Sequence, residues 1–368
     1  MQLKTKPIIL SLIVIFGITI LAFLVTSSVR YTSPTAVFQY IKTHPRDVAI
    51  VCLDPSKPQL GYFLNANEPF PLASTYKLVL LSAYANEVAL GGLDPKETLP
   101  ISELEKYYLP GTDGGAHLEF IKSLGTSRTS VNLDEVVDAM STFGSNAATD
   151  YLISRLKKTD FPNLFKRLGL TQTSQPTSFL GLYLFINNHE TGLYAEEQLS
   201  PEEIRAEQSR LADLFVNDPD WRKTEIEFIT KPTNAAPLFV QKQVVSSFGV
   251  NGSANDISRI LLAVYGNSSV FSSQEQTIMR NHLEWPMRHN PEKTKDFKVL
   301  ASASGAWPAV LTSAWFAQTQ NANARVLVVL YRNIPDDFWN TWISTFSHQQ
   351  FENQVLSSSD CSLFHQVQ

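Results

Sequence analysis

Segments with the composition and length of β-strands lie near the two ends of this chain, and the long stretch between them lacks strand character. Residues 47–53 (DVAIVCL) and 59–64 (QLGYFL) form an early pair, whereas residues 298–302, 310–318 and 324–332 form a late trio. Because isolated strand pairs are rarely stable, we expect the five segments to meet in one antiparallel sheet. The chain between the two groups would then leave the sheet and return to it.

Helical patterns fill the interval between the strand groups. Residues 74–90 read as a continuous apolar helix that Gly91-Gly92 ends. Further helices are expected at residues 133–140, 147–156, 160–168, 201–216, 255–265 and 273–283. Helices at residues 35–42 and from Pro335-Asp336 onward flank the strands. The expected fold class is α+β: an antiparallel sheet flanked by terminal helices, with a long all-helical lobe inserted between the early and late strands.

This order predicts two lobes. Residues 32–73 and 295–368 form an α/β lobe, and residues 74–294 form the all-helical lobe. A ligand site is expected where the lobes meet, because clefts between lobes are common binding sites.

Residues 1–31 are interpreted as a cytoplasmic stub followed by a transmembrane anchor. From residue 8 to residue 25 only Ser11, Gly17 and Thr19 interrupt an apolar run, and about 18–20 such residues span a bilayer as a helix. Lys4 and Lys6 precede the run, which favours a cytoplasmic N-terminus and an extracytoplasmic domain, at the cell surface or in the periplasm. The alternative is a cleaved signal peptide, which gives the domain the same location.

Charge and cysteine content argue against several classes of function. A net charge of −5 without a basic cluster argues against nucleic-acid binding. No metal-ligand spacing stands out, and no cofactor is expected. Cys52 and Cys361 lie near opposite ends of the chain without a CxxC spacing, which argues against a disulfide scaffold and a zinc site; the two can pair if the chain ends meet in the fold.

Ser74-Thr75-Tyr76-Lys77 is the first candidate for catalytic chemistry. Residues three apart share a helix face, so the Lys77 ammonium can lie beside the Ser74 hydroxyl and act as its base. The alternative is a helix N-cap followed by a surface lysine. The residues after Lys77 are wholly apolar, and a buried helix is a costly place for an unpaired charge.

This segment resembles the start of the central helix in the serine β-lactamase and D,D-peptidase (penicillin-recognising) superfamily, and the class A β-lactamase branch is the most similar. The resemblance covers the chain from about residue 35 and implies that Ser74 is the nucleophile and Lys77 its base. The second family motif, usually Ser-Asp-Asn, is matched to Ser145-Asn146-Ala147. Ser145 would relay a proton to the leaving group, and Ala147 replaces the asparagine; alternatively, Ser145 is a helix N-cap.

The third family motif, usually Lys-Thr-Gly, is matched to Ala303-Ser304-Gly305. The resemblance implies that Ser304 and Gly305 contact the substrate and that the N–H groups of Ala306 and Ser74 form the oxyanion hole. Tyr108 would line the rim of the cleft.

Two family features are missing from this sequence. No Lys or Arg occurs between Lys298 and Arg325, so the cation that grips a substrate carboxylate is absent, and such substrates should bind roughly ten- to a hundredfold more weakly. The region that should carry the deacylating Glu, residues 171–188, contains no acidic residue. Water activation would then fall to Lys77 or to a distant pair, His189-Glu190.

Two functions are consistent with these residues. The first is a β-lactamase-like serine hydrolase that forms an acyl-enzyme and acts on a small-molecule, peptide or ester substrate. The second is a catalytically silent β-lactamase-like protein that binds cell-wall or peptide ligands. Retention of Ser74, Lys77, Ser145, Ser304 and Gly305 favours the hydrolase, whereas the losses predict that β-lactam hydrolysis is not efficient.

Overall fold

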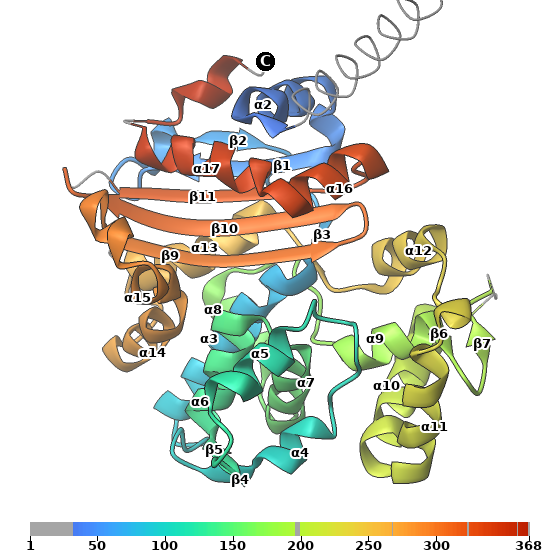
Figure 1. The fold of residues 1–368 in the computed structure, drawn as a ribbon. Coiled ribbons are helices and arrows are strands. Elements are labelled where there is room, and N and C mark those ends of the chain that lie inside the picture. The colour runs from blue at the N-terminus through green and yellow to red at the C-terminus, as the bar shows by residue number, and fades with distance from the viewer. Residues whose placement is uncertain (1–31, 196–198, 267, 322–323, 359, 367–368) are drawn as a thin grey trace, which may run out of the picture.

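A five-stranded antiparallel sheet is the centre of the protein, as shown by a computed structural model that describes residues 32–195, 199–266, 268–321, 324–358 and 360–366 (Figure 1). The strand order is β2 (Tyr62–Leu64), β1 (Val48–Leu53), β11 (Ala324–Tyr331), β10 (Val310–Thr319) and β9 (Phe297–Trp307). Both strand groups therefore join one sheet, with β1 paired to β11, which confirms the predicted α+β class.

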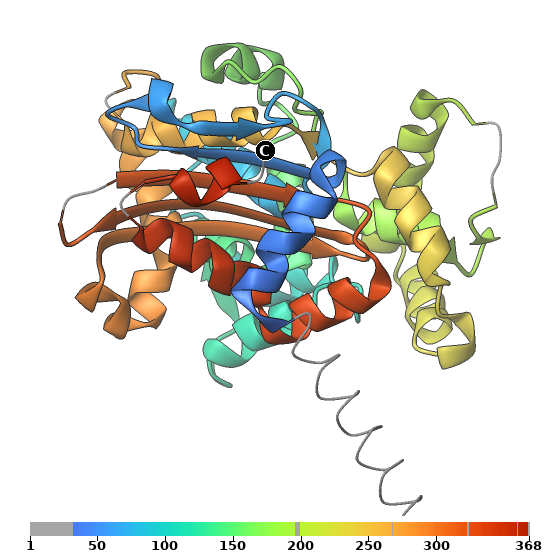
Figure 2. The same ribbon diagram turned by 90° about the horizontal axis from the view of Figure 1, so that it is seen from above.

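Both faces of the sheet are covered, so its central strands are apolar at nearly every position. On one face lie α2 (Pro34–Thr43), α16 (Asp336–Thr345) and α17 (Ser347–Ser357), as Figure 2 shows from above. Helix α13 (Ala254–Tyr265) packs against the other face. Successive residues of β11 point alternately to the two faces. Leu327 packs on the face covered by α2, α16 and α17, and Val328 packs on the face covered by α13.

The segment between the early and late strands is mainly helical. Helix α3 (Lys77–Ala89) is buried on nearly every side, as its apolar sequence requires. Around it lie α4 (Ile101–Glu105), α5 (Ala116–Ser123), α6 (Leu133–Asp138), α7 (Asn146–Arg155), α8 (Phe161–Leu168), α14 (Ser273–Leu283) and α15 (Trp285–His289). Three short strand pairs that the sequence did not predict also occur: β3 (Phe70–Pro71) with β8 (Asn251–Gly252), β4 (Thr98–Pro100) with β5 (Ser130–Asn132), and β6 (Asn187–Asn188) with β7 (Gly192–Leu193).

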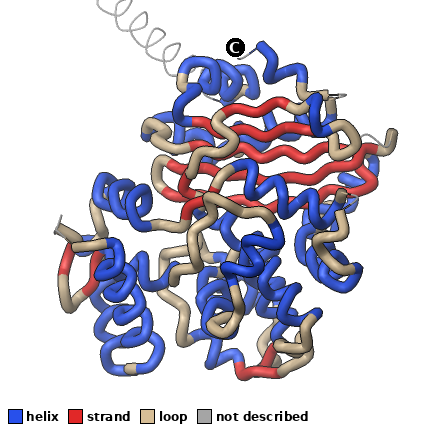
Figure 3. The backbone as a smooth tube through the Cα atoms, turned by 180° about the vertical axis from the view of Figure 1, so that it is seen from behind, coloured by secondary structure: helices blue, strands red, loops and turns tan. Residues whose placement is uncertain are grey.

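A separate apolar cluster forms where α9 (Phe179–Ile186) meets α10 (Pro201–Asn217), α11 (Pro219–Ile229) and α12 (Leu238–Phe248). Figure 3 shows these helices beside the rest of the helical region. The charged segment in α10 forms an amphipathic helix whose Leu211 and Phe215 are buried.

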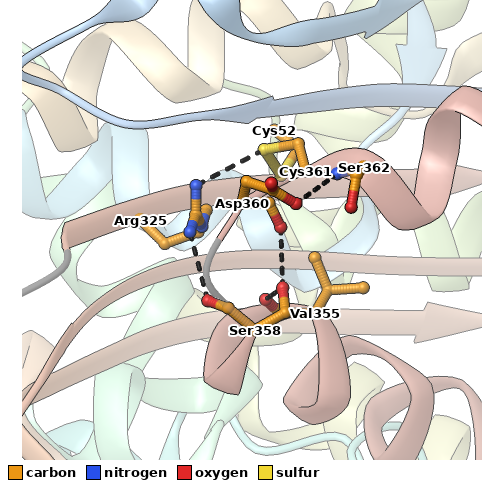
Figure 4. Close-up of a disulfide and its surroundings, with 7 residues drawn as sticks. All are labelled: Cys52, Arg325, Val355, Ser358, Asp360, Cys361 and Ser362. Atoms are coloured by element: carbon orange, nitrogen blue, oxygen red, sulfur yellow. Dashed lines mark hydrogen bonds between the residues drawn. A yellow bond between two sulfur atoms is a disulfide. The ribbon is translucent and has the colours of Figure 1, made fainter.

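Cys52 and Cys361 form a disulfide, the pairing that the sequence left open (Figure 4). Cys52 lies in β1, and the chain beyond α17 returns across this side of the sheet, where Phe364 stacks on Tyr62 of β2. The early and late parts of the chain therefore meet, and the Cα atoms of Cys52 and Cys361 lie 5.9 Å apart. The guanidinium of Arg325 is buried beside the disulfide.

Within the described ranges, no helix is long and apolar enough to cross a membrane. The anchor predicted for residues 1–31 lies outside these ranges.

Candidate active site

The chain enters α3 through a tight turn that presents Ser74 to a cavity. Ala73 has a φ of 45°, a left-handed conformation that costs an alanine roughly 1–2 kcal/mol. A single 3-10 turn (Ala73–Tyr76) follows, and it is fixed to the sheet by a hydrogen bond of 2.8 Å between the hydroxyls of Thr75 and Thr312. Strain held by surrounding contacts is common at functional sites.

Lys77, three residues after Ser74, is buried. Its ammonium donates hydrogen bonds to the carbonyl oxygen of Gly144 (2.5 Å) and to Oδ1 of Asn146 (3.0 Å). Burial lowers the pKa of Lys77 to about 8, against the opposing effects of the carboxylates of Asp113 and Asp150. This lysine can therefore exchange a proton near neutral pH.

Ser74, Ser304, Gly305 and Ala306 line the same cavity, which has a volume of about 550 Å³. Strand β9 is the edge strand of the sheet, and it passes directly over the turn that carries Ser74. A Cβ atom on Gly305 would lie 2.4 Å from the backbone nitrogen of Ser74. Gly305 is thus required by the approach of two backbone segments of this chain, in addition to any approach of a substrate.

A smaller cavity of about 240 Å³ touches Ser74 and Lys77 from another side. Gly144 and Ala303 both line it. Ala303, the residue matched to the motif lysine in the sequence analysis, therefore has a small side chain next to an open space that Ser74 also lines.

Ser145, the predicted proton relay, is placed apart from both cavities. Ser145 is fully buried and does not line either cavity: its Oγ accepts a hydrogen bond from the N–H of Ala148 and lies 3.0 Å from Nδ1 of His117. It is the N-cap of α7, which was the alternative interpretation. Asn146 lines the larger cavity and contacts Lys77. Its neighbours Gly144 and Asn146, and not Ser145, therefore lie next to Lys77.

Two carboxylates near Lys77 were missed by the sequence analysis. Asp113 lines the larger cavity and accepts backbone N–H groups of Gly115 and His117, each at 3.1 Å. The Asp-Gly-Gly sequence that begins at Asp113 is typical of a turn, and it was the only sequence feature that could have drawn attention to this residue. Asp150 lies one helical turn after Asn146 on α7, and burial raises its pKa to about 6, against the hydrogen bonds that it accepts.

Phe179 occupies the place beside Lys77 within the loop region that lacks an acidic residue. Its ring centroid lies 5.8 Å from Nζ of Lys77. Asp150 holds this segment, because it accepts hydrogen bonds from the hydroxyl of Ser178 (2.6 Å) and the N–H of Leu180 (2.9 Å). An apolar ring therefore faces the ammonium group of Lys77.

Three residues singled out in the sequence lie away from this group. Tyr108 stacks on His117, with ring centroids 4.7 Å apart, and it does not line the cavity. His189 contacts Glu225 at 2.6 Å, and Glu190 contacts Trp221 and Arg210. The last two therefore belong to the cluster around α10 and α11.

Charge within the larger cavity is sparse. Among the described residues that line it, none is Lys or Arg, and the one carboxylate belongs to Asp113. Burial lowers the pKa of His348 to about 4, so this residue is neutral at pH 7.

Solved structures with a similar fold are β-lactamases of low sequence identity. The β-lactamase from Sphaerobacter thermophilus gives a TM-score of 0.51 at 16% identity, covering 83% of this chain and 90% of that chain. The β-lactamase from Francisella tularensis gives 0.50 at 12% identity, covering 86% of this chain and 98% of that chain. At these identities the likeness shows the fold alone. A comparison with curated proteins gives no match.

The family is shown by a match over most of the sequence. The model of the β-lactamase enzyme family matches residues 35–349. This range begins in α2 and ends in α17, so it includes the whole sheet, the helical region and the cavity. The resemblance drawn from the motifs is confirmed, and the chain belongs to the β-lactamase enzyme family.

Proposed function

We propose that the protein is a membrane-anchored, extracytoplasmic serine hydrolase that forms an acyl-enzyme at Ser74. The observation that carries the proposal is the placement of Lys77: it is buried, its pKa is about 8, and it lines the smaller cavity together with Ser74. Near pH 7.5 roughly a quarter of such lysines are neutral and able to accept a hydroxyl proton.

The proposed reaction has two steps. Neutral Lys77 accepts the proton of Ser74 while Oγ attacks the substrate carbonyl carbon, and the N–H groups of Ser74 and Ala306 bind the oxyanion. The leaving group then departs with the proton from Lys77, since Ser145 does not line either cavity. Water hydrolyses the acyl-enzyme in the second step, which releases a carboxylic acid and restores Ser74.

Efficient β-lactam hydrolysis is not part of the proposal. Ala303 supplies no cation for the substrate carboxylate, Ser145 lines neither cavity, and Phe179 faces Lys77 where an acid would activate water. The same losses support the second candidate, a protein that binds its ligand or is acylated once without turnover.

Covalent labelling separates the two candidates. Full-length protein in detergent should react with a fluorophosphonate probe, and Ser74→Ala should abolish the adduct seen by intact-mass spectrometry. Incubation with penicillin G should give at most slow acylation with little turnover. No adduct with fluorophosphonate, ester or penicillin probes would contradict the hydrolase and leave the binder.

The proposed location rests on residues 1–31 and on the disulfide. Disulfides form and persist in oxidising compartments, so the buried bond between Cys52 and Cys361 supports an extracytoplasmic domain. Protease added to intact cells or spheroplasts should digest the domain, and an alkaline wash should leave the undigested protein in the membrane fraction. Release by the wash would indicate a cleaved signal peptide instead.

A further inference from the structure

We propose that the substrate of the Ser74 site is a neutral ester whose acyl part is an apolar hydrocarbon chain. This inference rests on the proposed hydrolase function and adds the chemical class of the acyl group. Three properties of the larger cavity carry it: its apolar walls, the charge on those walls, and the position of one part of the lining beside the start of the described chain.

Large apolar side chains form much of the wall of the larger cavity. Besides Phe179, they include Leu182, Trp307, Leu311, Trp339, Ile343 and Phe346. They come from α9, from the β9–β10 edge of the sheet and from α16 with its C-terminal residue.

Such walls favour a hydrocarbon chain over a polar acyl group. Burying one methylene group changes a binding equilibrium by about fourfold, which corresponds to ~0.8 kcal/mol. A volume of about 550 Å³ lies within the range of sites that enclose small organic molecules. Each added methylene should therefore raise kcat/KM until the chain fills the cavity.

The charges in the lining disfavour an acyl chain that ends in a carboxylate. The described lining has no Lys or Arg, and the carboxylate of Asp113 is already present. His348 is buried and neutral at pH 7. An anionic chain would lose its hydration without gaining a positively charged partner, which is costly.

Phe346 brings part of the lining to the protein surface near the proposed anchor. It is 53% exposed with a φ of 54°, and it lines the larger cavity. The hydroxyl of the next residue, Ser347, donates a hydrogen bond of 3.0 Å to the carbonyl oxygen of Thr32, the first described residue. A neutral ester in solution and a neutral amphiphile at the membrane surface would both present an apolar acyl chain to the lining at Phe346.

A matched pair of esters tests the charge requirement, and a chain series tests the apolar walls. Full-length protein in detergent is assayed with p-nitrophenyl acetate, butyrate and hexanoate, and with the mono-p-nitrophenyl ester of adipic acid, with Ser74→Ala rates subtracted. Hexanoyl and adipoyl chains have the same number of carbons and differ in the terminal carboxylate. We expect kcat/KM for hexanoate to be at least tenfold higher than kcat/KM for acetate. We also expect it to be at least tenfold higher than kcat/KM for the adipate ester.

Two substitutions separate the wall from the charge. Ile343→Ala should lower the ratio of the hexanoate rate to the acetate rate several-fold, whereas Leu118→Ala, at a 55% exposed site on α5, should not change this ratio. Ile343→Lys places a cation in the wall of the larger cavity and should raise the adipate-to-hexanoate ratio at least tenfold.

The outcomes for the substrate class and for the hydrolase function are distinct. Equal rates for all chain lengths, with Ser74 still labelled by fluorophosphonate, would overturn the substrate class and keep the hydrolase. Labelling of Ser74 by neither fluorophosphonate nor any ester would overturn both. Protein reconstituted in phosphatidylcholine vesicles with p-nitrophenyl palmitate then identifies the source: turnover assigns a membrane amphiphile, and turnover of soluble hexanoate alone assigns a free ester, with the substrate class supported in each case.

Discussion

The backbone at Ser74 lies so close to Gly305 that no side chain fits between them. A Cβ atom at Gly305 would lie 2.4 Å from the nitrogen of Ser74 and 2.7 Å from that of Thr75. Gly305→Ala should therefore move β9 away from the turn, reduce labelling of Ser74 at least a hundredfold and destabilise the fold by ~1–3 kcal/mol. In the control Gly92→Ala, the new Cβ meets the flexible end of Glu87, and labelling should persist.

The acylation rate should follow the ionisation of Lys77. Its pKa is lowered to about 8 by burial, so the rate should rise with pH, reach half its maximum near pH 8 and level off above it. Asp150 raises the pKa of Lys77 electrostatically, so Asp150→Asn should shift the midpoint to lower pH. Stopped-flow acylation by p-nitrophenyl acetate from pH 6 to 10 measures both curves. A flat profile in the parent protein would exclude Lys77 as the base.

Ser145 should matter for stability and not for acylation. Its Oγ caps α7 and contacts His117, and loss of an N-cap costs about 1 kcal/mol. Ser145→Ala should lower the free energy of unfolding by roughly 1–2 kcal/mol in urea while fluorophosphonate labelling keeps its rate. A tenfold slower labelling reaction with a smaller change in stability would restore the proton-relay role that the motif first indicated.

At the scale of single residues, the sequence predicts contacts within one helical turn. It does not predict contacts that depend on the residue at which a helix begins. Ser74 and Lys77 are three residues apart, so their proximity follows from helix geometry alone. Gly144, Ser145 and Asn146 are adjacent, and which of them faces the cavity depends on where α7 begins. That start is set by the capping hydrogen bond, which a three-residue pattern does not reveal.

Among the elements, α14 is joined to α6 by a buried histidine between two carboxylates. His282 lies 3.0 Å from Asp134 and 3.6 Å from Asp138. Asp134 also contacts Tyr84, and Asp138 also contacts Arg288. Burial opposes protonation of His282, but the hydrogen bond to Asp134 and the nearby carboxylate of Asp138 outweigh it and raise the pKa of the imidazole.

This contact should stabilise the fold more in mildly acidic than in basic solution. Because the folded-state pKa of His282 is raised, its contribution is complete below pH 6.5 and disappears as the pH rises through the folded value. Asp134 and Asp138 have pKa values below 3.8 and stay ionised throughout this window. Urea unfolding of the parent and of His282→Asn should therefore differ more at pH 6 than at pH 9. A difference that grows with pH would contradict the assignment.

The elements themselves were predicted to different extents for a physical reason. The central strands β1, β10 and β11 were identified because both faces of the sheet are covered there and their apolar runs are long. The strand pairs inside the helical region have two or three residues per strand, too few for any periodicity. The single terminal helix expected after residue 335 is divided at Phe346, which has a φ of 54°, a left-handed conformation that the apolar spacing does not reveal.

Across the whole molecule, the two chain ends build one half of the fold together. The early strands pair with late ones through β1 and β11, while α2, α16 and α17 share one apolar cluster. This return was predictable, because the two strand groups need each other to form a sheet. The pairing of Cys52 with Cys361 was not predictable, because the path of the last residues across β1 leaves no periodic pattern in the sequence.

The disulfide should therefore stabilise the whole domain without taking part in its chemistry. Cys52 and Cys361 are 309 residues apart, so the bond restricts a large part of the unfolded chain, and its loss should cost roughly 3–5 kcal/mol. Neither residue lines the larger or the smaller cavity. Cys52→Ala/Cys361→Ala should unfold at lower urea concentration, as should the parent protein in reductant, and reductant should not affect the double variant. Labelling of Ser74 should be unchanged in the absence of urea, and a loss of labelling in the folded double variant would mean that the tether also positions the active site.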